Sequence, residues 1–265
     1  MVSKNQGIDD LTQFGMEVIR SAGEEALSFY GKGKNQVKFD EELVTKAELD
    51  LTEFFKNQLY RRFPGHQIFT NTQEHKEYTH EGHRYVWVYD ALDGVANFQA
   101  GIPIWGTSLA LLENFWPIFG VFYMPVTGDL FYAQAGHNAF WGKEKAHVSA
   151  REDIDDESVL FTYSRFHTHY RSLFPGKIRN LGCTAAHICY VATGRAEGAV
   201  IANESYRDLA AARVIIEAAG GKIFKTDGGE LFLDEYLDGR RIYDHLLVVA
   251  PNTYSQLRSY LLKNS

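Results

Sequence analysis

The chain has 265 residues, of which 45% are apolar and 23% are charged, and its formal net charge is −7. This composition is ordinary for a globular protein that buries a sizeable core, in one large domain or in two packed halves. The acidic balance and the lack of lysine or arginine runs exclude nucleic-acid binding through a basic surface. No apolar stretch approaches the roughly 20 residues that span a bilayer, and the start, MVSKNQGIDD, lacks a signal-peptide pattern. We therefore expect a cytoplasmic protein with neither a nucleic-acid nor a membrane partner.

The N-terminal part of the chain has the periodicity of two helices. The first is predicted to begin at an aspartate cap at position 9 or 10 and to end at a glycine at 31 or 33. The second is predicted over residues 45–62, before a Pro-Gly stop. The residues predicted to face inward are Leu11, Phe14, Val18, Ala22 and Leu27 in the first helix, and Leu51, Phe54, Phe55 and Leu59 in the second.

After a polar segment the apolar pattern changes to that of strands. The run YVWVYD predicts a strand that delivers Asp90 at its carboxyl end. Aromatic and β-branched runs separated by turns then predict an antiparallel meander that ends near Gly142. The polar segment contains His75, His80 and His83, whose spacing matches neither a helical zinc motif nor a zinc finger. We interpret this segment as a loop.

The second half of the chain alternates between strand and helix patterns. The charged segment 147–158, with a possible capping box of Ser149 and Glu152, is interpreted as a junction between an N-terminal α+β half, residues 1–148, and a C-terminal α/β half, residues 149–265. We expect the halves to pack as one unit with the site between them. The predicted strands are SVLFTY, KIRNL, EGAVIA, GKIF and HLLVVAP, and the predicted helices cover about 166–173, 183–193, 208–219 and the final TYSQLRSYLLKN.

Two cysteines, Cys183 and Cys189, lie in one of these predicted helices. Their separation of six residues places them on different faces of a helix, so a disulfide between them is not expected. We interpret both as buried structural thiols.

The stretch VYDALDGVANF concentrates the polar chemistry of the chain. Asp90 and Asp93 follow a buried strand, where unpaired carboxylates are costly unless a cation compensates them. Carboxylates together with a backbone carbonyl form the hard oxygen set that Mg²⁺ prefers. Gly94 allows a close turn, and a helix that began there would offer free N–H groups to a phosphate. By itself, Asp-x-x-Asp also fits solvated acids or helix caps.

A third acid, Asp208, precedes an alanine-rich helical run. One interpretation is that it is the N-cap of that helix, a position that aspartate fills well. The other is that the same carboxylate also ligates a metal.

Together these residues carry a family resemblance. The chain resembles the inositol monophosphatase family, a branch of the Mg²⁺-dependent phosphatases that includes fructose-1,6-bisphosphatase. The resemblance spans most of the chain, and its motifs are specific in combination and order. The matching segments are ELVTKAE, YRRFPGHQIF, YDALDGVANF, GCTAAHICYVATGRAEG and YRDLAAARVIIEAAGG.

The resemblance implies a layered α-β-α-β-α sandwich, usually a homodimer, which hydrolyses small phosphomonoesters with a metal-activated water. It implies that Asp90 bridges metals, that the Leu92 carbonyl binds one of them, and that Asp93 and Asp208 bind another. It further places Glu48 where an acid assists a weakly held metal.

The resemblance also implies contacts with the substrate. The backbone N–H groups of Gly94 and Val95 would bind phosphate, and Thr184 and Ala185 would contact the alcohol part. Arg207 stands where the family has tryptophan. It could anchor phosphate or substrate, since its geometry suits both, but a surface salt bridge is an equally good interpretation.

Besides Arg207, and Ala91 in place of a proline, three further positions depart from the family pattern. Thr72 stands where the family has a glutamate that ligates the first metal, and Glu74 is the candidate to replace it as ligand and catalytic acid beside Asp90 and Asp93. Val95 replaces a threonine whose hydroxyl orients the attacking water, and valine cannot hydrogen-bond. Ile201 stands where many members use an acid to grip a sugar hydroxyl.

Two functional hypotheses follow. The first is an Mg²⁺-dependent phosphomonoesterase acting on a small phosphorylated polyol or sugar, such as an inositol monophosphate. The second is a catalytically impaired member that serves as a binding or scaffold protein and retains a cation site. The three aspartates and Gly94 favour the first hypothesis, and Thr72 and Val95 favour the second.

Overall fold

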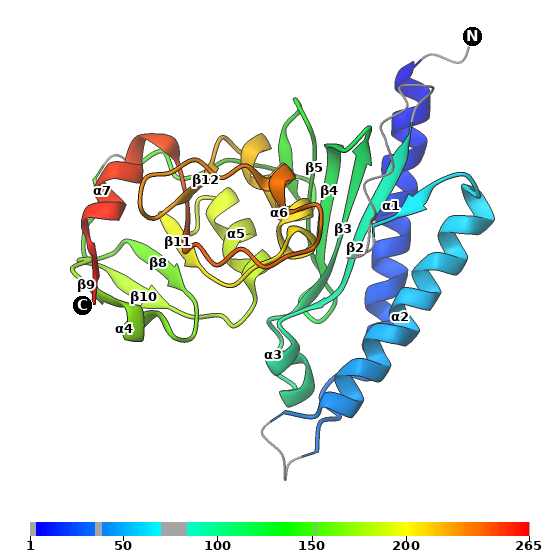
Figure 1. Ribbon diagram of the computed structural model, residues 1–265, viewed down its shortest axis with the longest axis horizontal. Coiled ribbons are helices and arrows are strands. Elements are labelled where there is room, and N and C mark those ends of the chain that lie inside the picture. The colour runs from blue at the N-terminus through cyan, green and yellow to red at the C-terminus, as the bar shows by residue number, and fades with distance from the viewer. Residues whose placement is uncertain (1–3, 35–38, 70–83, 152, 265) are drawn as a thin grey trace.

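The computed structural model describes residues 4–34, 39–69, 84–151 and 153–264. The described elements form five layers in the order α-β-α-β-α (Figure 1). Helices α1 and α2 cover one face of a seven-stranded sheet, and α5 and α6 lie between that sheet and a five-stranded one. Helices α4 and α7 pack beyond the second sheet. The predicted layered sandwich of the mixed α/β class is confirmed.

Helix α1 (Lys4–Ala26) packs on the first sheet through its predicted apolar stripe. The predicted start at residue 9 or 10 is wrong because the chain is already helical at Lys4, so neither aspartate caps the helix. Leu27, predicted to face inward, follows the last helical residue and leaves 39% of its surface exposed.

Helix α2 (Glu41–Arg62) begins four residues before the predicted start at 45. The reason is its cap: Asp40 Oδ1 accepts a hydrogen bond from the Leu43 N–H at 3.1 Å, which satisfies one of the free donors of the first turn. The predicted inward residues of α2 are fully buried except Phe54, which is half-buried.

The first sheet follows the chain from strand to strand, in the order β1 to β7. Only β1 pairs in parallel, and the remaining strands form the predicted antiparallel meander. The meander does not end near Gly142, because one further strand pairs beyond it. The strands are β1 (Gln67–Ile68), β2 (Tyr85–Asp93), β3 (Gly106–Glu113), β4 (Trp116–Met124), β5 (Asp129–Gln134), β6 (Ala139–Trp141) and β7 (Glu144–Ala146).

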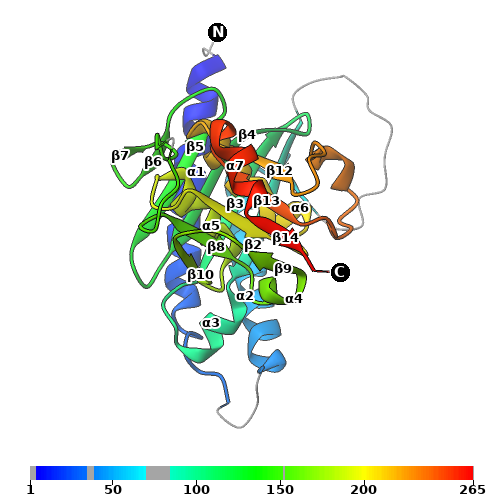
Figure 2. The ribbon, with the colours of Figure 1, turned by 90° about the vertical axis from the view of Figure 1, so that its left-hand side faces the viewer.

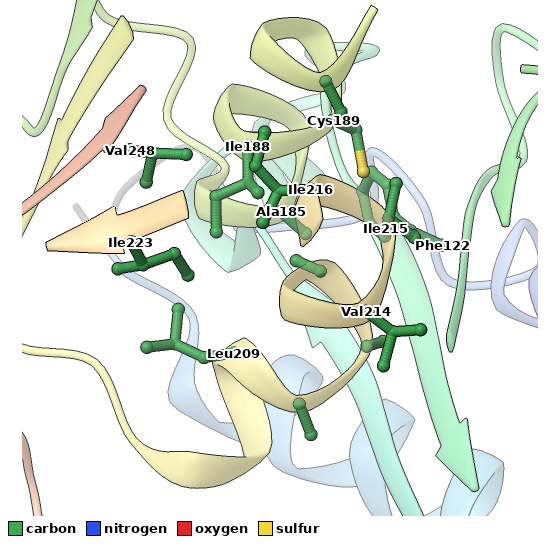
Figure 3. Close-up of a cluster of buried hydrophobic side chains, with 14 of the residues drawn as sticks. Phe122, Ala185, Ile188, Cys189, Leu209, Val214, Ile215, Ile216, Ile223 and Val248 are labelled. Carbon is green, nitrogen blue, oxygen red and sulfur yellow. The ribbon is translucent and has the colours of Figure 1, made fainter. Parts of the chain in front are cut away.

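The middle layer consists of α5 (Thr184–Ala192) and α6 (Tyr206–Ala218). Their apolar side chains meet residues from both sheets in one buried cluster (Figure 3). Helix α6 approaches the first sheet so closely that a Cβ at Gly120 would lie 2.4 Å from the Ala211 carbonyl oxygen. As predicted, Cys183 and Cys189 are buried free thiols.

The second sheet has the strand order β10-β8-β11-β13-β12. Strand β8 pairs in parallel with β10 and β11, as expected for an α/β half, whereas β13 runs antiparallel to both of its neighbours. The strands are β8 (Val159–Thr162), β10 (Lys177–Arg179), β11 (Gly198–Ile201), β12 (Lys222–Lys225) and β13 (Leu246–Val249).

The outer layer contains short elements. Two predicted helices, 166–173 and the C-terminal one, are shorter than expected because residues from each pair as strands β9 (Tyr170–Ser172) and β14 (Leu261–Lys263). The remaining helical elements are α4 (Phe166–His169), α7 (Tyr254–Ser259) and the 3₁₀ turns η1 (Leu233–Tyr236) and η2 (Pro251–Thr253).

The junction segment contains no helix in its described residues. The predicted capping box at Ser149 is therefore wrong, and the Ser149 hydroxyl instead accepts a local hydrogen bond from the Arg151 N–H at 3.3 Å. Glu152, its predicted partner, lies outside the described residues. No helix in the described part of the chain combines the length and the apolar character that crossing a membrane requires.

Candidate active site

The pairing of β2 with β3 shifts register between Asp90 and Asp93, which changes the direction of the last side chains of β2. Asp90 lies opposite Ser108, and Asp93 lies opposite Gly106, so three residue steps on β2 face two on β3. An extra residue of this kind bends a strand and changes the direction of its side chains. The strand therefore extends past the predicted end at Asp90 and brings both aspartates to one pocket.

Gly94 turns the chain from β2 into helix α3 (Val95–Ala100). Its φ of 85° lies in the left-handed region that favours glycine. A Cβ there would also lie 2.9 Å from the Ile104 carbonyl oxygen and 3.1 Å from Cys183 Cβ. Conformation and space both require glycine at this position, and a helix does begin directly after it.

Asp93 joins this turn to the start of α5. Its carboxylate accepts hydrogen bonds from the backbone N–H groups of Thr184 at 3.2 Å and Ala185 at 2.5 Å, and from Cys183 Sγ at 3.3 Å. The family resemblance implies that Thr184 and Ala185 contact the substrate. In the structure their N–H groups hold Asp93, and neither residue lines the pocket.

Asp208 is the third residue of α6, and the N-cap is Ser205. The interpretation of Asp208 as the N-cap is therefore wrong. Its carboxylate accepts a hydrogen bond from the Ser205 N–H at 2.7 Å, in the geometry of a capping box. The same oxygen lies 3.2 Å from Arg241 Nη1.

A cavity of about 390 Å³ collects most of the predicted site residues. Of the remaining predictions, Glu74 and Thr72 lie outside the described residues. Ile201 is wholly buried in β11 and does not line the cavity. The lining residues that the sequence predicts are Glu48, Asp90, Leu92, Asp93, Gly94, Val95, Arg207 and Asp208.

Sequence analysis missed Glu204 and Arg241, which also line the cavity. Glu204 is buried, and its Oε1 accepts a hydrogen bond from the Thr184 hydroxyl at 2.9 Å. It follows Asn203, whose φ of 63° turns the chain out of β11. A glutamate four residues before Asp208, after a turn-forming asparagine, is a signal that could have identified it.

The acids of the cavity raise one another's proton affinity. Burial, together with the negative charges of Asp208 and Asp93, raises the pKa of Asp90 well above its usual value. Burial also raises the pKa of Asp93, against the opposing effect of the Ala185 hydrogen bond. The pKa of Glu204 is raised well above its usual value by burial and by the same two aspartates. Crowded, desolvated carboxylates of this kind favour a cation that neutralises them.

The oxygen donors of the cavity fit Mg²⁺ in their chemistry, since all are carboxylates or backbone carbonyls. Within the part of the chain described, however, no three His, Cys, Asp or Glu side chains are arranged to hold a metal ion. The hydrogen bonds explain this: Asp93 is turned toward α5, and Asp208 toward Ser205 and Arg241. A bound cation would have to compete with these contacts for the two carboxylates.

The inositol monophosphatase family model matches residues 8–264. The chain belongs to this family. The resemblance carried by the DALDG segment and by the α5 and α6 segments is thereby confirmed. The family match spans both sheets and every residue that lines the acid-lined cavity.

Individual relatives agree with this assignment. A histidinol-phosphatase of Chlorobaculum parvum is 31% identical over 232 residues, covering 84% of this chain and 88% of that protein. A Nus factor SuhB of Xylella fastidiosa is 31% identical over 158 residues, 56% of this chain and 58% of that one. Among solved structures, a Thermotoga maritima IMPase superposes with a TM-score of 0.75 at 23% identity, covering 95% of this chain and 96% of that one. The family and the first relative indicate a phosphatase, that is, a phosphoric monoester hydrolase.

Proposed function

We propose that this protein is an Mg²⁺-dependent phosphomonoesterase that hydrolyses a small phosphorylated polyol or sugar, such as an inositol monophosphate. One observation carries the proposal: Asp90, Asp93 and Asp208 line one cavity together with the Gly94 turn. The family match supports a phosphatase, and the 390 Å³ cavity suits a small phosphorylated metabolite.

Mg²⁺ would be held by Asp90, Asp93, Asp208 and the Leu92 carbonyl, with Glu74 as a further candidate outside the described residues. When bound, it would supply positive charge to the phosphate oxygens and acidify the attacking water. The raised pKa of Asp90 supports this assignment, because a carboxylate destabilised by burial and neighbouring acids gains most from a cation.

The chain itself would position the phosphate. The first N–H groups of a helix have no partner within that helix, so the N–H groups of Gly94 and Val95 are suited to the phosphate oxygens. Arg207 and Arg241 line the same cavity and bring two guanidinium groups to it. In this scheme Arg241 would exchange its contact with Asp208 for one with the substrate.

The alcohol part of the substrate would meet Glu204. This buried carboxylate lines the cavity and already accepts a hydroxyl hydrogen bond, from Thr184. A substrate hydroxyl or ammonium group could donate to it in the same way. Glu204 would thus do the work that the family assigns to the acid absent at Ile201. Histidinol phosphate, which the name of one relative suggests, belongs in the substrate panel for this reason.

The test is phosphate release from inositol, sugar and histidinol phosphates with and without Mg²⁺. We expect Mg²⁺-dependent release that falls about 10²–10³-fold in Asp93→Asn, since a charged ligand of the ion that stabilises the reacting phosphate is lost. Asp156→Asn is the matched control, because Asp156 is exposed and outside the cavity. Release that is equal in wild type and Asp93→Asn contradicts the proposal.

The alternative proposal, a binding or scaffold protein that retains a cation site, rests on Val95, which has no hydroxyl to orient a water. The relative named Nus factor SuhB gives it some support. Calorimetry separates the two proposals: Mg²⁺ binding that Asp93→Asn abolishes, without phosphate release from any substrate in the panel, favours the scaffold.

The resemblance to the family also leads us to propose a homodimer. Light scattering of the purified chain checks this, and a mass of one chain at micromolar concentration would contradict it.

A further inference from the structure

A second polar cavity, of about 360 Å³, lies on the C-terminal half of the molecule. Its lining comes from α4, β9, the connection between β12 and β13, and the C-terminal strand β14 with the residue after it. Figure 2 shows α4, β9 and β14 next to one another at the C-terminal end of the chain. It shares no lining residue with the acid-lined cavity, so the proposed phosphatase chemistry does not account for it.

Two histidines face each other in this cavity. His169 ends α4 and His245 precedes β13, and their ring centroids lie 4.9 Å apart with the rings at 75°. Each ring is held through Nδ1: His169 by the Tyr163 hydroxyl at 2.9 Å, and His245 by the Tyr170 hydroxyl at 2.9 Å. On each imidazole, Nε2 is the nitrogen left for a ligand.

His169 Nδ1 has three oxygen neighbours. The Tyr163 hydroxyl lies at 2.9 Å, and the Thr168 hydroxyl and the Arg165 carbonyl oxygen each lie at 3.2 Å. The carbonyl oxygen can only accept a hydrogen bond, and in the tautomer that donates to it the proton is on Nδ1 and the lone pair is on Nε2. Histidines that ligate metals are held in this way, with the second ring nitrogen donating to a carbonyl, carboxylate or water.

Charged groups of both signs also line this cavity. Two carboxylates, Asp227 and Asp244, share the cavity with the ammonium of Lys263. Lys225 also pairs with Asp244 at 3.0 Å. The two lysines therefore balance the two carboxylates, and the imidazoles decide which ion the cavity prefers.

We propose that His169 and His245 form a site for a divalent transition-metal ion that prefers imidazole ligands, such as Zn²⁺, Ni²⁺ or Cu²⁺. The described residues hold no set of three His, Cys, Asp or Glu side chains arranged for a metal, so the pair supplies two ligands and water completes the coordination. His169 ends α4 and His245 directly precedes β13, so a bound ion ties α4 to the start of an inner strand of the second sheet. The site differs in kind from the oxygen-lined cavity, which suits Mg²⁺.

The test uses the full chain without an affinity tag, stripped of metal and held in excess Mg²⁺ so that the acid-lined cavity does not contribute. Calorimetric titration with Ni²⁺ is expected to show one site per chain. His169→Gln and His245→Gln should each weaken Ni²⁺ binding at least about tenfold. Removing a residue that only supports a metal ligand typically costs about 10–100-fold in affinity, and removing the ligand itself should cost no less. His137→Gln, which changes an exposed histidine outside this cavity, should bind like wild type.

Two results would overturn the proposal. The first is Ni²⁺ affinity that is unchanged in both histidine variants. The second concerns the unmodified chain and does not depend on any variant folding: the electron paramagnetic resonance spectrum of one equivalent of bound Cu²⁺ should show coupling to imidazole nitrogen. A spectrum with oxygen ligands alone rejects the site. Neither measurement uses phosphatase activity. The test of this metal site is therefore independent of the test of the proposed function.

Discussion

Val95 has the backbone position that the proposed chemistry requires but lacks the side-chain hydroxyl that this chemistry would use. Its position at the start of α3, on the lining of the acid-lined cavity, is the one that the family resemblance implies. Its backbone N–H is retained, so phosphate binding is expected to survive. Its side chain has the shape of threonine without the hydroxyl, so orientation of the attacking water is expected to suffer.

We predict that Val95→Thr raises kcat about 10-fold or more, since one positioned hydrogen-bonding group contributes on the order of 10²–10⁴ in rate. Combining it with Thr72→Glu should raise kcat further, because both changes act at the same proposed metal. Steady-state phosphate release measures both effects. Val126→Thr, at an exposed valine in a turn, is the control. No gain in a variant that folds and binds Mg²⁺ as wild type does would refute the role assigned to Val95.

His187 gives a second prediction at the residue scale. It is buried in α5, its Nε2 accepts the Leu181 N–H at 2.9 Å, and its ring stacks on Phe161. Its Nδ1 has no hydrogen-bond partner. Burial lowers the pKa of His187 from 6.5 to about 4, so a protonated ring is strongly disfavoured in the folded state.

The sign of the pH effect follows from linkage. The unfolded state takes up the proton near pH 6.5, whereas the folded state does so only near pH 4, so the free energy of unfolding should decrease as the pH falls between these values. The full effect is about 3 kcal/mol, of which about 2 kcal/mol falls between pH 7 and pH 5. Urea unfolding at pH 7 and pH 5 measures it. His187→Gln should lose stability less steeply than wild type, and an identical slope in the two proteins contradicts the prediction.

At the scale of elements, the turn from β2 into α3 is the most constrained local structure of the site. The apolar strand pattern and the Asp-x-x-Asp-Gly pattern predicted the strand and the close turn, and they left open whether a helix follows. They did not show the break in pairing with β3, which depends on a partner strand.

Gly94 and Gly128 provide a matched pair for testing this turn. Both have positive φ, 85° and 76°, but a Cβ at Gly128 would meet nothing within 4 Å. We predict that Gly94→Ala destabilises the protein by about 2–4 kcal/mol, and Gly128→Ala by only about 1 kcal/mol, the cost of backbone conformation alone. Denaturant unfolding compares the two variants. Equal losses would show that the contacts with Ile104 and Cys183 relax without cost.

The element boundaries show where local signals fail. Periodicity located α1, α2, α5 and α6, because long amphipathic helices repeat their signal over several turns. It failed at residues 170–172, where a predicted helix is strand β9, because this segment pairs with β14 some ninety residues later. A three-residue strand is decided by its partner and has too few residues for a periodic signal of its own.

At the scale of the whole molecule, the middle layer joins the two halves. One buried cluster takes residues from both sheets and from α5 and α6. Neither sheet can bury its inner face without these helices. The boundary predicted at residue 148 therefore separates two sheets that share a core.

This sharing predicts a single cooperative unfolding transition. Ile215→Ala, in the middle of α6, should lower the free energy of unfolding by about 2–5 kcal/mol, the cost of a large cavity in a core. Native-state hydrogen exchange should show the same loss of protection in β4 and β11. Loss confined to one sheet would show that the halves unfold independently.

The sequence by itself determined the family, the layer order that the family resemblance implies, and the three aspartates, because each of the motifs behind them is a short local pattern. Only the tertiary structure revealed that Glu204 and Arg241 join the cavity, that Thr184 and Ala185 hold Asp93, and that His169 faces His245. Each of these contacts joins segments far apart in the chain. Their geometry depends on how the layers pack, and local propensity does not predict that packing.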